Sequence, residues 1–363
     1  MFKRDRRWIW VFLGIFTILL RVILGNFPQV IEQYYSRGLF IGFRNLIDYT
    51  IALVPIPLIY VLIFGLFGFI LYRIFRKKDK SRPLKKKVLS FIFSTFAFIF
   101  AVVSLFLWLW GFNYGRVPIE NQIGIVPEPL SKEAIFQELQ VSTQELVIAF
   151  EKIKDFDDSY FEQYVFENDI ESQVRKEINN IFVKLGYPTP GRVRARYLYP
   201  KGTLLRISTA GFYMPLTGEC HVDPGLHPLQ IPYVMAHEFA HGYGIGDEGS
   251  CNFIAYLTCK ASNDPVMNYT GLLSYWRSVA SQYRSVDPIH YKEFRATIPN
   301  GIIEDLQKIN TQMDKYPDFF PAVRDATYNA YLQTQGIEEG LKNYSRVVLL
   351  VTAYRESEVR GER

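Results

Sequence analysis

The first third of the chain contains three long apolar runs separated by polar or basic segments. They cover about residues 8–24, 51–72 and 88–110, and each approaches the roughly 20 residues that a helix needs to cross a ~30 Å hydrocarbon core. Apolar runs of this length with almost no charge are typical of membrane-spanning helices rather than of buried helices in a soluble protein. We therefore predict a membrane region at residues 1–112 with three transmembrane helices.

After this region the pattern changes to the shorter periods of a folded domain, which we place at residues 113–363. Helical periodicity is followed by two β-prone runs, RVRARYLY and LLRISTAGFYMPL, and then returns after Pro232. The predicted helices cover about residues 131–153, with Ser131 as N-cap, 158–187, 232–243, 249–261, 269–285, 300–314, 320–334 and 338–354. The pattern indicates one mainly helical α+β domain with a small sheet.

Charge gives the predicted spans an orientation. Residues 73–87 carry nine Lys or Arg against one Asp, and four more cations precede the first span. Because Lys and Arg concentrate in cytoplasmic loops, we predict a cytoplasmic N-terminus and an extracytoplasmic domain at 113–363. A basic run between two apolar runs indicates membrane topology rather than nucleic-acid binding, so the lipid bilayer is an expected partner and nucleic acid is not.

The stretch VMAHEFAHGYGIGDEGSCN, at residues 234–252, carries the most specific chemical signal. His237 and His241 are four residues apart and so share one face of a helix, where both imidazoles can reach one Zn²⁺ ion. Glu238 lies between them, in the position of the general base that takes a proton from water in HExxH enzymes. We predict that His237 and His241 bind zinc and that Glu238 is catalytic.

Two templates supply different third ligands. HEFAHGYGIGD fits the metzincin pattern His-Glu-x-x-His-x-x-Gly-x-x-Asp, which selects Asp247, and PVMNY at 265–269 then resembles a Met-turn. The gluzincin template instead takes Glu248 from the start of the next helix. We prefer Glu248, because the glycines between residues 242 and 246 allow a tight reversal and the segment after it has a helical apolar face. Cys251 is a weaker rival.

The positions around this motif give further expectations. Asn252 is placed to hydrogen-bond a ligand histidine. The three cysteines are an odd number, which leaves either one disulfide from Cys220 to Cys251 or Cys259, or free buried thiols. The remaining histidines, His221, His227 and His290, lack ligand spacing and are more typical of structural or solvated groups.

Over nearly its full length the chain resembles a bacterial membrane family known as domain of unknown function 3810. The resemblance is carried by LWGFNYGR, GFYMPLTGE, the HExxH helix followed by CNFIAYLTC, and NYSRVVLLVTAYR. It implies a zincin-like metallopeptidase domain on an anchor in the bacterial cytoplasmic (inner) membrane. Members often have Glu-x-Glu-Ala-Asn-Phe where this chain has EGSCNF at 248–253, so the second carboxylate is replaced by Ser250.

The resemblance also implies roles outside the metal site. In zincins a strand upstream of the metal helix often lines the cleft and pairs with extended substrate, and RISTAGFYMPL is the matching segment, with an ordinary core strand as the alternative. An oxyanion donor commonly comes from later in the chain, where Tyr344 and Arg346 are candidates.

Together these features predict a membrane-anchored, gluzincin-like zinc metalloendopeptidase that hydrolyses a peptide or protein near the membrane. The alternative is a catalytically silent zinc-binding module with a sensory or binding role. Glu238 favours the enzyme, because a structural zinc site needs no base. A transporter is excluded, because the three spans lack intramembrane charges and broken repeats.

Overall fold

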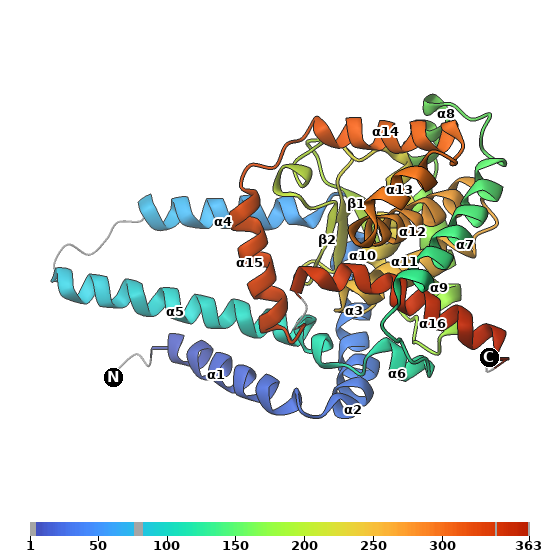
Figure 1. Cartoon of the computed structure of the whole chain (residues 1–363). Helices are drawn as coiled ribbons and strands as arrows, with labels where there is room; N and C mark the ends of the chain where they lie inside the picture. Colours follow the sequence, from blue (N-terminus) through green and yellow to red (C-terminus); the bar gives the residue numbers. More distant parts are fainter. Residues whose placement is uncertain (1–4, 76–82, 338–339, 362–363) are drawn as a thin grey trace. The chain divides into compact units, whose positions relative to one another are not determined.

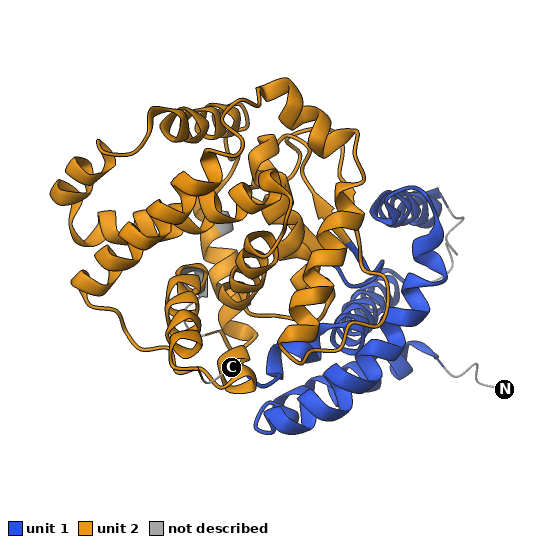
Figure 2. Ribbon diagram, turned by 90° about the vertical axis from the view of Figure 1, so that its right-hand side faces the viewer, with its two compact units in different colours: residues 1–117, 214–219 blue, residues 118–213, 220–363 orange. Residues whose placement is uncertain are grey.

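The computed structural model describes residues 5–75, 83–337 and 340–361 of the chain (Figure 1). These fall into two compact units, coloured separately in Figure 2. Unit 1 comprises residues 1–117 and 214–219, and unit 2 comprises residues 118–213 and 220–363. Helices predominate throughout, with one three-stranded sheet, which confirms the prediction of a mainly helical protein with a small sheet.

The described residues of unit 1 include three helices long and apolar enough to cross a membrane: α1 (Arg7–Leu24), α4 (Leu58–Phe75) and α5 (Leu84–Leu109). Their number and approximate positions agree with the prediction. Helix α4 begins at Leu58 rather than at residue 51, because the prolines at 55 and 57 disfavour helix in the residues before them. The predicted orientation depends partly on cations at 3–4 and 76–82, which lie outside the described residues.

Short helical segments follow α1 and α5 along the chain. They are α2 (Pro28–Val30), the π-helix η1 (Ile31–Leu39), α3 (Phe40–Asp48), and the 3-10 segments η2 (Ile51–Leu53) and η3 (Gly111–Gly115). Buried Glu32 binds both Arg37 and Arg116, each at 2.7 Å. The segment 214–219 belongs to this unit, and Glu219 Oε2 accepts a hydrogen bond from Leu58 N, at the first residue of α4 (2.7 Å).

Unit 2 is built from helices around a buried apolar core. The helices are α6 (Ile119–Ile123), α7 (Lys132–Phe150), α8 (Asp158–Phe166), α9 (Ile170–Lys184), α10 (Ile231–Gly242), α11 (Glu248–Lys260), α12 (Pro265–Val286), α13 (Pro288–Arg295), α14 (Asn300–Asp314), α15 (Pro321–Thr334) and α16 (Arg346–Val359), with 3-10 segments η4 (Leu205–Ile207), η5 (Pro228–Gln230) and η6 (Gly340–Ser345). Ser131 caps α7 as predicted, accepting a hydrogen bond from Ala134 N.

Several segments differ from their predicted structure, and of the predicted helix at 338–354 residues 340–345 form the 3-10 segment η6, while 338–339 lie outside the described residues. Residues 158–187 form two helices, because Asp169 accepts from Ser172 N and starts α9 as a new helix. PVMNY is not a Met-turn but the first part of α12, capped by Asp264. The prediction also missed α13, an eight-residue helix that begins directly after α12.

The sheet has the order β1-β3-β2, with β1 (Arg194–Tyr197) and β2 (Gly211–Met214) on either side of β3 (Glu219–Val222). The two predicted β-prone runs contribute β1 and β2, although residues 205–207 within the second run form η4. The central strand was not predicted, because its four residues, ECHV, have no apolar alternation and are all buried. Strand β2 is therefore an edge strand.

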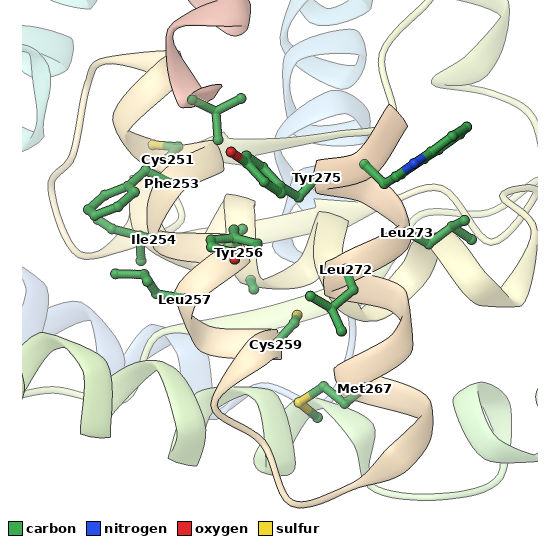
Figure 3. Close-up of a cluster of buried hydrophobic side chains, with 14 of the residues drawn as sticks. Cys251, Phe253, Ile254, Tyr256, Leu257, Cys259, Met267, Leu272, Leu273 and Tyr275 are labelled. Carbon is green, nitrogen blue, oxygen red and sulfur yellow. The ribbon is translucent and has the colours of Figure 1, made fainter. Parts of the chain in front are cut away.

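Helices α11 and α12 form the centre of the core (Figure 3). Figure 3 shows side chains of α11 and α12 in this core, including Tyr256 and Tyr275, whose ring centroids lie 4.4 Å apart. Gly271 permits this close approach, since a Cβ there would come within 2.4 Å of Cys259 Cβ. The helix that begins with Glu248 is thus fixed along its length by packing.

The far end of α11 carries a cluster of charged side chains contributed by several helices. Lys260 of α11 and Arg355 of α16 both bind Glu145 of α7, at 2.8 and 2.6 Å. Arg355 also lies 3.3 Å from Glu138 of α7, which accepts a hydrogen bond from Tyr275 of α12. We call Glu138, Glu145, Lys260 and Arg355 the helix-linking cluster, because it joins α7, α11 and α16.

Candidate metal centre

Helix α10 positions both histidines of the HExxH motif, and its sequence explains where it begins and ends. Pro232 lies in its first turn, where the missing amide hydrogen costs nothing. At the other end Gly244 adopts φ +90°, and the backbone amides of Gly244 and Ile245 bond back to His241 O and Ala240 O. This Schellman arrangement turns the chain back toward α10.

The reversal fixes the orientation of both imidazoles. His241 Nδ1 lies 2.8 Å from Ile245 O, and His237 Nδ1 lies 2.8 Å from Asn252 Oδ1. The contact predicted between Asn252 and a histidine is therefore present. An acceptor at each Nδ1 fixes the orientation of each ring and leaves Nε2 as the nitrogen that would bind a metal once its own proton is lost.

Glu248, the first residue of α11, faces these two Nε2 atoms. Its Oε2 lies 3.1 Å from His237 Nε2 and 3.4 Å from His241 Nε2. Ligand atoms that share a tetrahedral Zn²⁺ at 2.0–2.1 Å lie about 3.3 Å apart, so the three donors fit this ion. Burial alone would raise the pKa of Glu248, but the adjacent imidazoles lower it well below its usual range.

Asp247, the metzincin alternative, has a different role. It is the N-cap of α11, and its Oδ1 accepts from Ser250 N at 2.6 Å. The same oxygen lies 3.2 Å from Arg346 Nη1, and Arg346 also binds Glu120. Because capping directs this carboxylate along the helix end, Asp247 faces Ser250 and Arg346 rather than the histidines. Arg346, a candidate oxyanion donor, is engaged there as well.

Cys251 also lies close to the histidines, and with His237 and His241 it forms a compact group of potential ligands. Its Sγ is 3.4 Å from His241 Nδ1 and 3.5 Å from Ile245 O, which is the side of the ring already bonded to backbone. Burial raises the pKa of this thiol to about 12. Glu248, in contrast, lies on the Nε2 side of both rings. All three cysteines are free and buried, which confirms the expected alternative of free buried thiols rather than a disulfide.

Glu238 is buried beside His237 and His241. Its Oε2 has no hydrogen-bond partner among the described residues. A Cβ at Gly211 of β2 would lie 2.9 Å from Glu238 Oε1 and 2.6 Å from His221 O, so only glycine leaves this carboxylate its place. Burial raises the pKa of Glu238 to about 7, against the lowering effect of the imidazoles. A group with this pKa can accept and return a proton near neutrality.

Two tyrosines complete the site on the side of η6 and α15. The Tyr328 hydroxyl donates to Glu248 Oε1 at 2.8 Å and lies 3.1 Å from the Tyr344 hydroxyl. The Tyr344 ring stacks parallel to the His237 ring, with centroids 6.3 Å apart. Tyr344 was a candidate from the sequence, whereas Tyr328 was missed, since nothing local distinguishes it among 24 tyrosines.

The site is closed to solvent in this structure. His237 and His241 are 9% exposed, Glu238 is 4% exposed and Glu248 is 3% exposed. A surface cavity of about 530 Å³ lies elsewhere, between α8, η5 and α14, and contains Lys308, which binds Asp158. That cavity contains none of the four residues and no comparable convergence of donors, so we place the candidate chemistry at the buried group.

The other histidines have roles in the fold. His227 caps η5 in a reciprocal arrangement with Gln230, and His290 Nδ1 lies 2.6 Å from Tyr283 OH on α12. His221 lies on β3 with its ring 5.0 Å from that of Phe212. None of the three is grouped with the candidate metal ligands.

Comparison with known proteins gives one match. A family model described as "Protein of unknown function (DUF3810)" matches residues 35–352, most of the chain. No curated protein and no solved structure matches it significantly.

Proposed function

The chain belongs to the DUF3810 family, and since that family has no established activity, we propose from the residues of this chain that it is a zinc-dependent, zincin-like metalloendopeptidase of the bacterial inner membrane. One observation carries the proposal. Two imidazole Nε2 atoms meet Glu248 Oε2 at the spacing of tetrahedral zinc ligands, and the unpartnered carboxylate of Glu238 lies beside them. The three apolar helices of unit 1 support the membrane location.

His237, His241 and Glu248 would hold the ion. Zinc bound by three protein ligands supplies Lewis-acid chemistry, polarising a carbonyl group and making a water molecule more acidic. Asn252 and the Ile245 carbonyl hold the two imidazoles in the tautomer that binds metal, and Tyr328 occupies the second oxygen of Glu248. The donors are therefore oriented before any ion arrives.

Glu238 is the group that moves protons. Its Oε2 takes a proton from the attacking water as the water oxygen bonds to the peptide carbonyl carbon. The same oxygen then gives that proton to the leaving nitrogen as the carbon–nitrogen bond breaks, so that a carboxylic acid and an amine result. Burial raises the pKa of this carboxylate to about 7 and excludes competing water.

Strand β2 is the proposed support for the substrate. It is the edge strand of the sheet and begins at Gly211, beside Glu238. An extended peptide added to such an edge would run past the general base. Tyr344 is the proposed donor to the carbonyl oxygen, because its ring stacks against His237.

The burial of the site favours one alternative function. A site in which no proposed ligand is more than 9% exposed also suits a silent zinc-binding module, because such a module does not have to admit a substrate. The enzyme proposal requires the covering elements to move. Activity and metal content must therefore be measured on the same preparation.

The test uses the full-length chain in lipid nanodiscs. Zinc per chain and cleavage of a mixed peptide library are measured for wild type, Glu238→Gln, Glu248→Ala and the control His290→Ala, which changes a histidine outside the site. We expect one zinc in all except Glu248→Ala. Cleavage should persist in His290→Ala and fall about 10²–10⁴-fold in Glu238→Gln.

Two results would overturn parts of the proposal. Zinc retained at wild-type affinity in Glu248→Ala would remove Glu248 from the ligand set. Wild-type protein that carries one zinc per chain and cleaves nothing in the library would instead favour the silent module.

A further inference from the structure

Unit 2 carries a small exposed apolar patch formed by two loops that are distant in sequence. Phe319 and Phe320, between α14 and α15, are 59% and 70% exposed, and Ile207 of η4 is 51% exposed. Phe319 N donates to Arg206 O at 3.0 Å, which brings the two loops together. Large apolar side chains gathered in this way mark an interaction surface rather than ordinary solvent exposure.

Polar contacts hold this patch in place. Asp318 accepts hydrogen bonds from Ser208 Oγ and from Phe320 N, the latter at 3.0 Å. The guanidinium of Arg206 lies over the ring of Phe319, 5.3 Å from its centroid. The aromatic side chains therefore project from a braced turn, and the one cation of the patch lies directly beside them.

We propose that this patch, formed by Arg206, Ile207, Phe319 and Phe320, docks unit 2 onto the lipid headgroup region of the membrane that anchors the chain. Phe and Ile enter the boundary between headgroups and acyl chains, and the adjacent Arg pairs with lipid phosphate. The carboxylate of Asp318, beside the patch, is already hydrogen-bonded to the neighbouring loop and so adds little repulsion.

The short connection to α5 and the small size of the patch support the bilayer as the occupant. Helix α5 ends at Leu109 and unit 2 begins at Pro118, so the connecting segment spans at most about 30 Å. A domain tethered this closely to a spanning helix experiences a high effective concentration of lipid surface. A patch of a few side chains, too small for a stable protein interface, is then sufficient to orient the domain.

The experiment measures where Phe320 lies in the full-length chain in lipid nanodiscs. Phe320→Cys is labelled with a bimane fluorophore, and the wild type serves as the labelling background, since its three cysteines are fully buried. Quenching is measured with nitroxide lipids and with aqueous iodide. Ile289→Cys on α13, at a site 76% exposed, is the matched control.

We expect nitroxide lipids to quench the label at 320 at least twofold more than the label at 289, and iodide to show the reverse order. Ile207→Cys should report the same depth as Phe320→Cys, which checks that the label itself has not disturbed the turn. Adding Arg206→Gln to the labelled variant should lower lipid quenching in anionic discs.

Two outcomes would overturn the proposal. A label at 320 that iodide reaches as readily as it reaches 289 would leave the patch in water. A label shielded from both quenchers would mean that protein, such as a second copy of the chain, covers the patch. Neither outcome bears on zinc binding, so this test is independent of the proposed enzymatic activity.

Discussion

Helix α11 carries a group of buried or half-buried charges at each end, and the two groups differ in how their charges are balanced. At its end, the helix-linking cluster sets two carboxylates against two cations, Lys260 and Arg355. At its start, Glu248 faces two imidazoles and the Tyr328 hydroxyl, and Glu238 beside them has one carboxylate oxygen without a partner among the described residues. The first group is complete, whereas the second leaves room for a cation.

This difference distinguishes charged groups that stabilise the fold from charged groups that are available to bind another molecule. A buried carboxylate that meets an arginine and a tyrosine gains its compensation within the fold. A buried carboxylate without a partner costs about 1–3 kcal/mol, and a fold keeps such a group when another molecule supplies the missing interaction. Four sets of variants test this difference.

The same change at each end of α11 gives the largest contrast. Glu248→Ala should lower zinc affinity more than 100-fold, because it removes a ligand and outer partners alone are worth 10–100-fold. Glu145→Ala should leave zinc affinity unchanged and lower the unfolding temperature. Competition with a chelator and thermal unfolding in nanodiscs measure the two effects. Equal zinc loss in both variants would contradict the distinction.

Removing Arg355, one of the two cations of the helix-linking cluster, should lower stability and leave zinc affinity unchanged. Arg355→Met leaves Glu138 buried without its cation, at a cost of about 3 kcal/mol. This corresponds to a decrease of roughly 6–12 °C in the unfolding temperature. Arg355→Lys, which keeps the charge, is the control and should lose less. An unchanged unfolding temperature of Arg355→Met would show that this cluster contributes little to the stability of the fold.

Gly211→Ala tests the space around the general base. The new Cβ would meet Glu238 and His221 O, so the carboxylate or the strand must shift. A displacement near 1 Å can cost about 100-fold in turnover. Zinc content should stay at one per chain, since Gly211 contacts no proposed ligand. Gly42→Ala, with no atom near its added Cβ, is the control. Full activity in Gly211→Ala would show that the position of the Glu238 carboxylate does not depend on the space left by Gly211.

Tyr328→Phe should have the smallest effect. It removes the hydrogen bond to Glu248 Oε1 and frees that oxygen to move. We expect about tenfold weaker zinc binding, at the lower end for an outer partner of a metal ligand. Tyr331→Phe, on the same helix and with its ring stacked 6.1 Å from that of Tyr328, is the control. Equal affinity in both variants would make the Tyr328 contact incidental.

Local signals in the sequence predicted much of this arrangement. The spacing of His237 and His241, the cap at Ser131 and the three apolar runs each depend on residues within a few turns of one another. The preference for Glu248 rested on the glycines after α10, and Gly244 does provide the positive φ that the reversal needs.

Features that depend on distant residues were not predicted. Tyr328 reaches Glu248 across 80 residues, and Arg346 reaches Asp247 across 99. The central strand ECHV is buried on both faces and has no alternation to reveal it. Such contacts follow from the packing of whole helices, which no local window of the sequence contains.

The rigidity of α11 limits how its gene can vary. Glu248 and Lys260 lie at the two ends of 13 helical residues, a separation of about 18 Å. One inserted or deleted codon between them would rotate one end by about 100° relative to the other, so that either the zinc ligand or the cation leaves its partners. The length of this helix is thus constrained as strictly as the residues it carries, whereas a codon added in an exposed loop would disturb neither end.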